Sequence, residues 1–66
     1  MTWLFDRDGE KIRYEINRDR ALNRYRVVIT QPDGSASVEE VDEPDEVIER
    51  SLAFMSSLKS KGWRFA

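Results

Sequence analysis

The amino-acid sequence predicts an α+β domain, a four-stranded antiparallel β-meander with one C-terminal α-helix packed on one face. Residues 44–61 alone repeat their apolar residues with a helical period, whereas the residues before them form four shorter β-prone runs. Turn-forming or polar residues separate these runs, and short turns join neighbouring antiparallel strands. Because 66 residues is the size of one small domain, we expect residues 1–66 to fold as a single unit.

The first two strands are predicted to form a hairpin. Residues 2–6 contain three consecutive large apolar side chains, and Asp8-Gly9 completes a turn signal directly after them. Residues 10–17 alternate apolar and polar side chains, which is the pattern of a strand with one buried face. Two such runs across an Asp-Gly turn indicate an antiparallel pair.

Two further strands follow. Residues 18–23 are polar and lack a tight-turn dipeptide, so we expect a longer connection there. Residues 25–31 predict the third strand, and the sequence PDGS at 32–35 is the clearest turn in the chain. Residues 36–41 predict a fourth strand at a sheet edge, because glutamates and a low apolar content suit an edge.

The start of the helix is marked by Pro44. Proline is favoured in the first helical turn, where its missing N–H has no acceptor to lose, and it also forces Glu43 out of the helical conformation. Acidic residues gather here, at the positive end of the helix dipole. Either Asp42 or Asp45 could supply the capping carboxylate, and the sequence does not choose between them.

The end of the helix is marked by Gly62, which suits the left-handed residue that terminates many helices. In the hydrogen-bonding pattern of a Schellman motif, Trp63 would fold back onto Leu58. Phe65 would then complete the edge of the core. The alternative is that Trp63 and Phe65 form an exposed aromatic tail beside Arg64.

Alternation along the strands assigns side chains to the two faces of the sheet. The helix-covered face is predicted to carry Trp3, Phe5, Ile12, Tyr14, Ile16, Tyr25, Val27 and Ile29. They would meet an apolar arc of the helix composed of Val47, Ile48, Leu52, Met55 and Leu58. The open face would hold Leu4, Lys11, Arg13, Glu15, Arg24, Arg26, Val28, Glu39 and Val41. A charge at Leu52 is therefore expected to unfold the domain.

Composition argues against an enzyme. The chain has no histidine and no cysteine, which excludes catalytic triads built on them and the usual zinc sites, and its glycines are isolated. The carboxylates at 42–46 lack the spacing of a calcium loop, and we interpret them as charge at the helix start. Ser56-x-x-Lys59 matches a serine–lysine motif only formally, without the motifs that accompany it in acyl enzymes. We expect no catalytic residue, no metal and no cofactor.

Charge is unevenly distributed along the chain. Residues 33–49 contain eight acidic and no basic residues, whereas residues 50–66 contain four basic and no acidic ones. Five arginines, Arg13, Arg18, Arg20, Arg24 and Arg26, could bind single-stranded DNA or RNA, although the aromatic residues that would stack on bases point to the other face. The order of four strands and a helix resembles small single-strand-binding transcription coactivators in architecture alone, with no shared motif residues.

Association with protein is the favoured function. We expect a small non-catalytic protein-interaction module, either homodimeric or bound to another protein, with nucleic-acid binding as the alternative. The predicted interaction surface is the open sheet face, with Leu4, Lys11, Arg13, Arg24, Arg26 and Val28. Leu4, Val28 and Val41 would form its apolar cluster, and pairing along an exposed strand edge is a second route. The lack of cysteine, of a signal peptide and of a long apolar run leads us to expect a cytoplasmic protein without a membrane partner.

Overall fold

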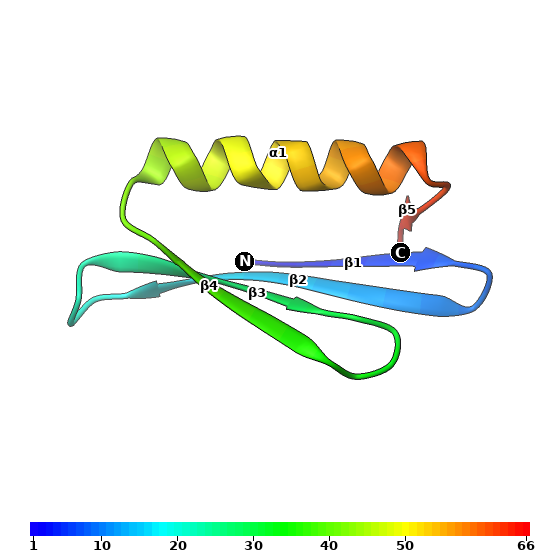
Figure 1. Cartoon of the computed structure of the whole chain (residues 1–66), viewed down its shortest axis with the longest axis horizontal. Helices are drawn as coiled ribbons and strands as arrows, with labels where there is room; N and C mark the ends of the chain where they lie inside the picture. Colours follow the sequence, from blue (N-terminus) through cyan, green and yellow to red (C-terminus); the bar gives the residue numbers. More distant parts are fainter.

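The computed structural model describes residues 1–66 and confirms the predicted fold class. One antiparallel sheet has the strand order β4-β3-β2-β1-β5, and helix α1 lies along one of its faces (Figure 1). The elements are β1 (Thr2–Arg7), β2 (Glu10–Asp19), β3 (Arg24–Thr30), β4 (Ala36–Val41), α1 (Pro44–Ser60) and β5 (Arg64–Phe65). The sequence did not predict β5, a two-residue strand that extends the sheet beyond β1.

The β1–β2 hairpin forms as predicted. Asp8 and Gly9 both have positive φ angles, 51° and 82°, as in the two-residue turns whose twist matches that of paired strands. Phe5 pairs with Ile12 and Trp3 pairs with Tyr14, so these apolar side chains share the face covered by α1.

The connection between β2 and β3 is shorter than predicted, since β2 continues to Asp19 and leaves only residues 20–23 between the strands. The carboxylate Oδ1 of Asp19 accepts hydrogen bonds from the backbone N–H groups of Ala21 and Leu22, at 3.1 and 3.2 Å. Asn23 closes the loop with a φ of 51°. The end of β2 is polar on both faces, so hydrophobic alternation could not reveal it.

The register of β4 corrects the predicted position of two side chains. Val41 pairs with Tyr25 and Glu39 pairs with Val27, so both lie on the helix-covered face rather than on the open one. Val41 is one of the most deeply buried residues, with 2% of its surface exposed. Glu39 forms an ion pair with Arg50 on α1. The predicted apolar cluster of Leu4, Val28 and Val41 on the open face is therefore wrong.

The start of α1 differs from the prediction in its capping. Glu43 has the extended conformation expected before a proline, with φ −104° and ψ 131°, and it is the residue at the N-cap position. No side chain caps the helix, so neither Asp42 nor Asp45 has that role. The Asp42 carboxylate instead lies 3.0 Å from Nε of Arg24 on β3.

The end of α1 is the predicted Schellman motif. The N–H of Trp63 donates to the carbonyl of Leu58 at 3.0 Å, and the N–H of Gly62, which has a φ of 90°, donates to Lys59 at 3.1 Å. Trp63 is buried, and the guanidinium of Arg7 lies 4.6 Å from the centre of its ring. The chain thus returns from the helix to β1, where β5 pairs with it.

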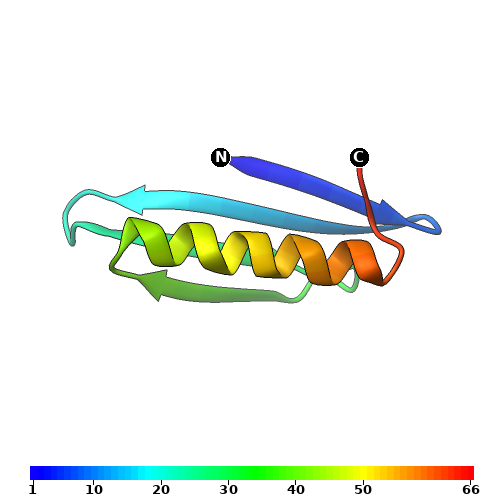
Figure 2. The same cartoon turned by 90° about the horizontal axis from the view of Figure 1, so that it is seen from above.

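The core confirms the predicted sheet face and corrects the helix face. Every sheet residue predicted to face the helix is buried or packs against the core. On α1, however, Ile48 and Leu52 are 59% and 64% exposed, while Ser51 is buried and Phe54 packs against the core. The helix contacts β3 and β4, and Figure 2 shows it displaced from the β1 side of the sheet. Its apolar arc is wider than the surface it meets, so the flank towards β1 stays uncovered.

Candidate functional site

The open face of the sheet carries the six residues predicted as an interaction surface. Strand pairing places Leu4 opposite Arg13, and alternation puts both on the face away from α1, together with Lys11, Arg24, Arg26 and Val28. Leu4 is half-exposed, Lys11, Arg13 and Arg26 are exposed, and Arg24 and Val28 are partly buried. Arg18 pairs with Tyr25, whose side chain faces the helix, so Arg18 does not belong to this face.

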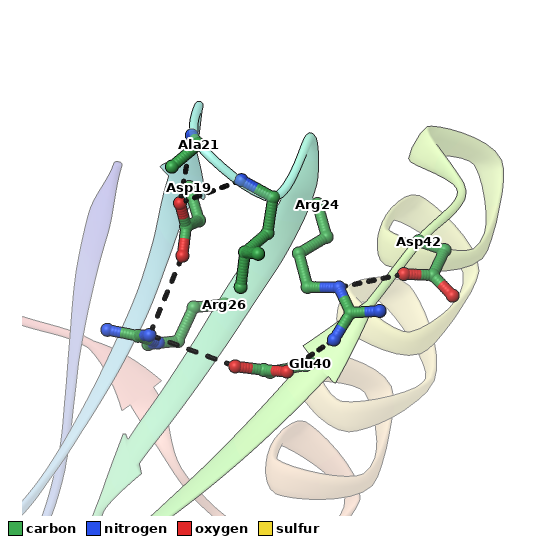
Figure 3. A network of polar contacts seen from close by, with 7 residues as sticks. Asp19, Ala21, Arg24, Arg26, Glu40 and Asp42 are labelled. Carbon is green, nitrogen blue, oxygen red and sulfur yellow. Dashed lines mark hydrogen bonds and ion pairs between the residues drawn. The ribbon is translucent and has the colours of Figure 1, made fainter.

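Acidic partners accompany most of these cations (Figure 3). Arg24 forms ion pairs with Glu40 at 2.6 Å and with Asp42, and this hydrogen bond to Glu40 together with the charge of Asp42 raises the pKa of the guanidinium above its ordinary value. Arg26 lies 3.8 Å from carboxylate oxygens of both Asp19 and Glu40. At this end of the open face, arginines and carboxylates therefore alternate, and they do not form a continuous basic surface.

At the other end of the open face, Arg13 forms an ion pair with Glu15 at 2.7 Å. No aromatic side chain lies among these residues, because Trp3, Tyr14 and Tyr25 have the parity of the covered face. Bases of single-stranded nucleic acid bind strongly where aromatic rings stack on them. The arrangement offers charge to a partner but no stacking platform.

The covered side of the molecule has a feature that the sequence did not predict, an apolar groove between α1 and β1. It consists of two adjoining hollows of about 380 and 830 Å³ that share Leu52 and Met55. The first is lined by Met1, Trp3, Ile16, Tyr25, Pro44, Val47, Ile48, Ser51, Leu52 and Met55. The second is lined by Phe5, Leu52, Met55, Ser56, Lys59, Gly62, Trp63, Arg64 and Phe65. We call the two hollows together the α1–β1 groove.

The groove lies between two sets of polar contacts, one made by α1 with β4 and one made by the start of β1 with β2. The Glu39–Arg50 ion pair links α1 to β4, the strand farthest from β1, and Arg50 also pairs with Glu46 one helical turn away, at 2.8 Å. Hydrogen bonds to Glu39 and Glu46 raise the pKa of Arg50 above its ordinary value. At the opposite edge, the Met1 ammonium group donates to the carbonyl of Ile16 at 2.9 Å and keeps the start of β1 on the sheet.

Several large apolar side chains around the groove are exposed to solvent. Leu52 and Ile48 on the helix are joined by Phe65 at 65% exposure and Met1 at 79%. The ring of Phe65 lies 4.9 Å from that of Phe5, so one side of it packs on the core edge and the other side faces solvent. Exposed apolar patches of this kind commonly mark interaction sites. The over-wide apolar arc of the helix was the signal in the sequence that could have revealed it.

No group of three or more acidic side chains is gathered in a way that could hold a metal ion. The single helix is too short and too polar to cross a lipid bilayer. Comparisons with protein-family models, with curated proteins and with solved structures give no match.

Proposed function

We propose that this chain is a non-catalytic protein-interaction module of the cytoplasm, and that its α1–β1 groove is the surface that binds the partner. The observation that carries the proposal is the exposure of Leu52, Ile48 and Phe65 around two adjoining hollows, the first of which is lined almost wholly by apolar side chains. Grooves of this shape receive apolar side chains of a helix or an extended segment, and a few central contacts supply most of the binding energy.

Charge at the groove supports a protein partner. Asp45 and Lys59 flank Ile48 and Leu52 on the helix, while Lys59 and Arg64 line the hollow nearer the C-terminus. An apolar centre with a charged rim is the usual anatomy of a protein–protein interface. The open sheet face, with Leu4, Arg13 and Val28, is the second surface on which such a partner could dock.

A selection from a random peptide library tests the proposal and requires no named partner. The chain would be immobilised at low density, and the site of selected peptides would be mapped by NMR chemical shifts. We expect shifts at residues of the α1–β1 groove, and a loss of affinity of at least about tenfold with Leu52→Asp. Ala53→Asp is the matched control, because Ala53 is also exposed but lies on another side of α1. Shifts confined to the open sheet face would refute the groove as the binding surface. So would the absence of any selected peptide from a chain that is monomeric on the support.

Single-stranded nucleic acid is the second candidate partner. It is favoured by the common face of Lys11, Arg13, Arg24 and Arg26, and opposed by the carboxylates interleaved with them. Phosphate contacts would make the affinity fall steeply with salt. Retention on a column of single-stranded DNA at low salt, abolished by Arg13→Glu and Arg26→Glu together, would support this function. Free passage through the column would exclude it.

A further inference from the structure

We propose that the partner bound by the α1–β1 groove is a second copy of this chain, with the two α1 helices antiparallel across a two-fold axis at Leu52. This inference rests on the function proposed above, and it specifies the partner. It is carried by the exposed flank of the helix, where Asp45, Ile48, Leu52, Ser56 and Lys59 follow one another at intervals of three, four, four and three residues. We call these five residues the α1 stripe.

The α1 stripe is self-complementary. At 100° per residue its five members lie within a band about 80° wide, on the side of the helix that faces away from β4. The spacing reads the same in both directions, so a two-fold axis at Leu52 superimposes the stripe on itself in antiparallel orientation. Leu52 then meets Leu52 of the second copy, Ile48 lies beside Ser56, and Asp45 lies opposite Lys59.

The two ends of the stripe carry opposite charges, and neither charge has an ion-pair partner within the chain. Asp45 and Lys59 form no ion pair within the chain, whereas Glu46 and Arg50, on the other side of the helix, are paired. Each charged end lies about 10 Å along the helix axis from Leu52, so an antiparallel neighbour brings Asp45 of one copy to Lys59 of the other. A dimer would form this pair twice, once at each end.

The need for additional burial favours a second copy over a monomeric state. Only nine of the 66 residues are buried, and no disulfide is present to compensate for a small core. Domains of this size commonly gain stability by oligomerisation. Pairing along the stripe would cover Ile48 and Leu52, the exposed large apolar side chains of α1. Because Leu52 lines both hollows, the second helix would lie across the opening of the α1–β1 groove.

A charge-reversal experiment tests this geometry. Asp45→Lys places lysines at both 45 and 59, and Lys59→Asp places aspartates at both, so each variant alone has like charges facing each other across the axis. We expect each to sediment as a monomer at concentrations of about 100 µM, where the wild type is a dimer. An equimolar mixture should form the heterodimer, since both facing pairs are then opposite in sign. The double variant D45K/K59D should dimerise like the wild type.

Folding is monitored in the same samples, because both reversals oppose the helix dipole and are expected to lower the melting temperature slightly. Unchanged far-UV circular dichroism at the assay temperature would exclude unfolding as the cause of lost dimerisation. Leu52 is 64% exposed, so the expectation from the sequence that a charge there unfolds the domain no longer holds. Leu52→Asp should therefore also give a folded monomer, and Ala53→Asp a dimer.

Three results would overturn the proposed dimer. They are a monomeric wild type, a dimer insensitive to Leu52→Asp, and a mixture of the two charge variants that stays monomeric. A monomeric wild type whose α1–β1 groove still binds selected peptides would leave the interaction function intact with a different partner. A monomer with no peptide bound at the groove would refute both.

Discussion

The hydroxyl oxygens of Tyr14 on β2 and Ser51 on α1 lie 2.7 Å apart inside the core. Ser51 donates its own proton to the carbonyl of Val47, at 2.8 Å, so Tyr14 is the donor in the bond between the two hydroxyls. A buried serine requires such partners, and the geometry fixes the helix face that meets the sheet. It explains why Ser51 is inside while Leu52, the next residue, is outside.

The effects of substituting Tyr14 and Ser51 on the unfolding free energy should depend strongly on each other. Ser51→Ala leaves the buried tyrosine hydroxyl without an acceptor and is expected to cost about 1–3 kcal/mol of unfolding free energy. Tyr14→Phe should cost about 1 kcal/mol. The double variant should be less destabilised than the sum of the two, since no hydroxyl is then left unpaired. Urea denaturation of the four proteins measures the coupling, and strict additivity would show that the hydrogen bond does not form.

Two leucines on the same helix should differ sharply in their effect on stability. Leu58 is 6% exposed, so Leu58→Ala is expected to cost about 2–5 kcal/mol through lost burial and a cavity. Leu52→Ala should change the stability of the monomer by no more than about 0.5 kcal/mol, because the side chain is solvent-exposed. Thermal denaturation at low protein concentration compares the two without a contribution from association. Equal losses would mean that α1 presents the other face to the sheet.

The helix terminus depends on the left-handed conformation of Gly62. An added Cβ would meet only Cδ of Arg7, at 3.6 Å, so the strain of Gly62→Ala comes from the φ of 90° and not from crowding. We expect a loss of about 1–2 kcal/mol. Gly62→Asn is the matched variant and should cost less, because asparagine tolerates positive φ. Equal stability of the alanine variant and the wild type in urea denaturation would contradict the Schellman ending.

The turn between β3 and β4 should show a pH effect at Asp33. The hydroxyl of Ser35 donates to the Asp33 carboxylate at 2.6 Å and its backbone N–H donates at 2.9 Å, and these bonds lower the pKa of Asp33 below its ordinary value of 3.8. A depressed pKa in the folded state means that the stabilisation is present above pH 3.8 and is lost as pH falls through the folded pKa.

Carboxyl-carbon NMR titration measures this effect directly. Ser35→Ala should move the Asp33 midpoint upwards, since the hydroxyl bond is the largest cause of the shift. Ser37→Ala, at an exposed position on the following strand, is the control and should leave the midpoint unchanged. A midpoint at the ordinary aspartate value in the wild type would show that the turn does not hold the carboxylate through these bonds.

The sequence predicted much of this fold because successive side chains alternate between the two faces in β1, β2 and β3, and this alternation assigns each side chain to one face of the sheet. The error in β4 has a physical origin. Val38 and Val41 are three residues apart and cannot share a face, so alternation alone leaves the choice open. The turn decides it, because the pairing of Thr30 with Ala36 carries Val41 to the covered face. A one-residue shift in such a turn exchanges the two faces of the whole strand.

The helix and the α1–β1 groove were harder to predict, for a related reason. The helical period defines an apolar arc, but the position of the sheet within that arc depends on tertiary contacts. The Tyr14–Ser51 hydrogen bond and the Glu39–Arg50 ion pair join residues distant in sequence, and they place α1 over β3 and β4. The resulting exposure of Leu52, and hence the groove, cannot be derived from local pattern alone.

The most direct test of the α1–β1 groove as the interaction surface is a map of backbone amide chemical shifts over a range of concentrations, from about 10 µM to about 1 mM. The groove and its proposed self-association predict concentration-dependent shifts at Ile48, Leu52 and Ser56. The Ala53→Asp control should show the same concentration dependence as the wild type. Shifts that cluster instead at Arg13, Arg26 and their neighbours on the open sheet face would contradict this assignment of the surface.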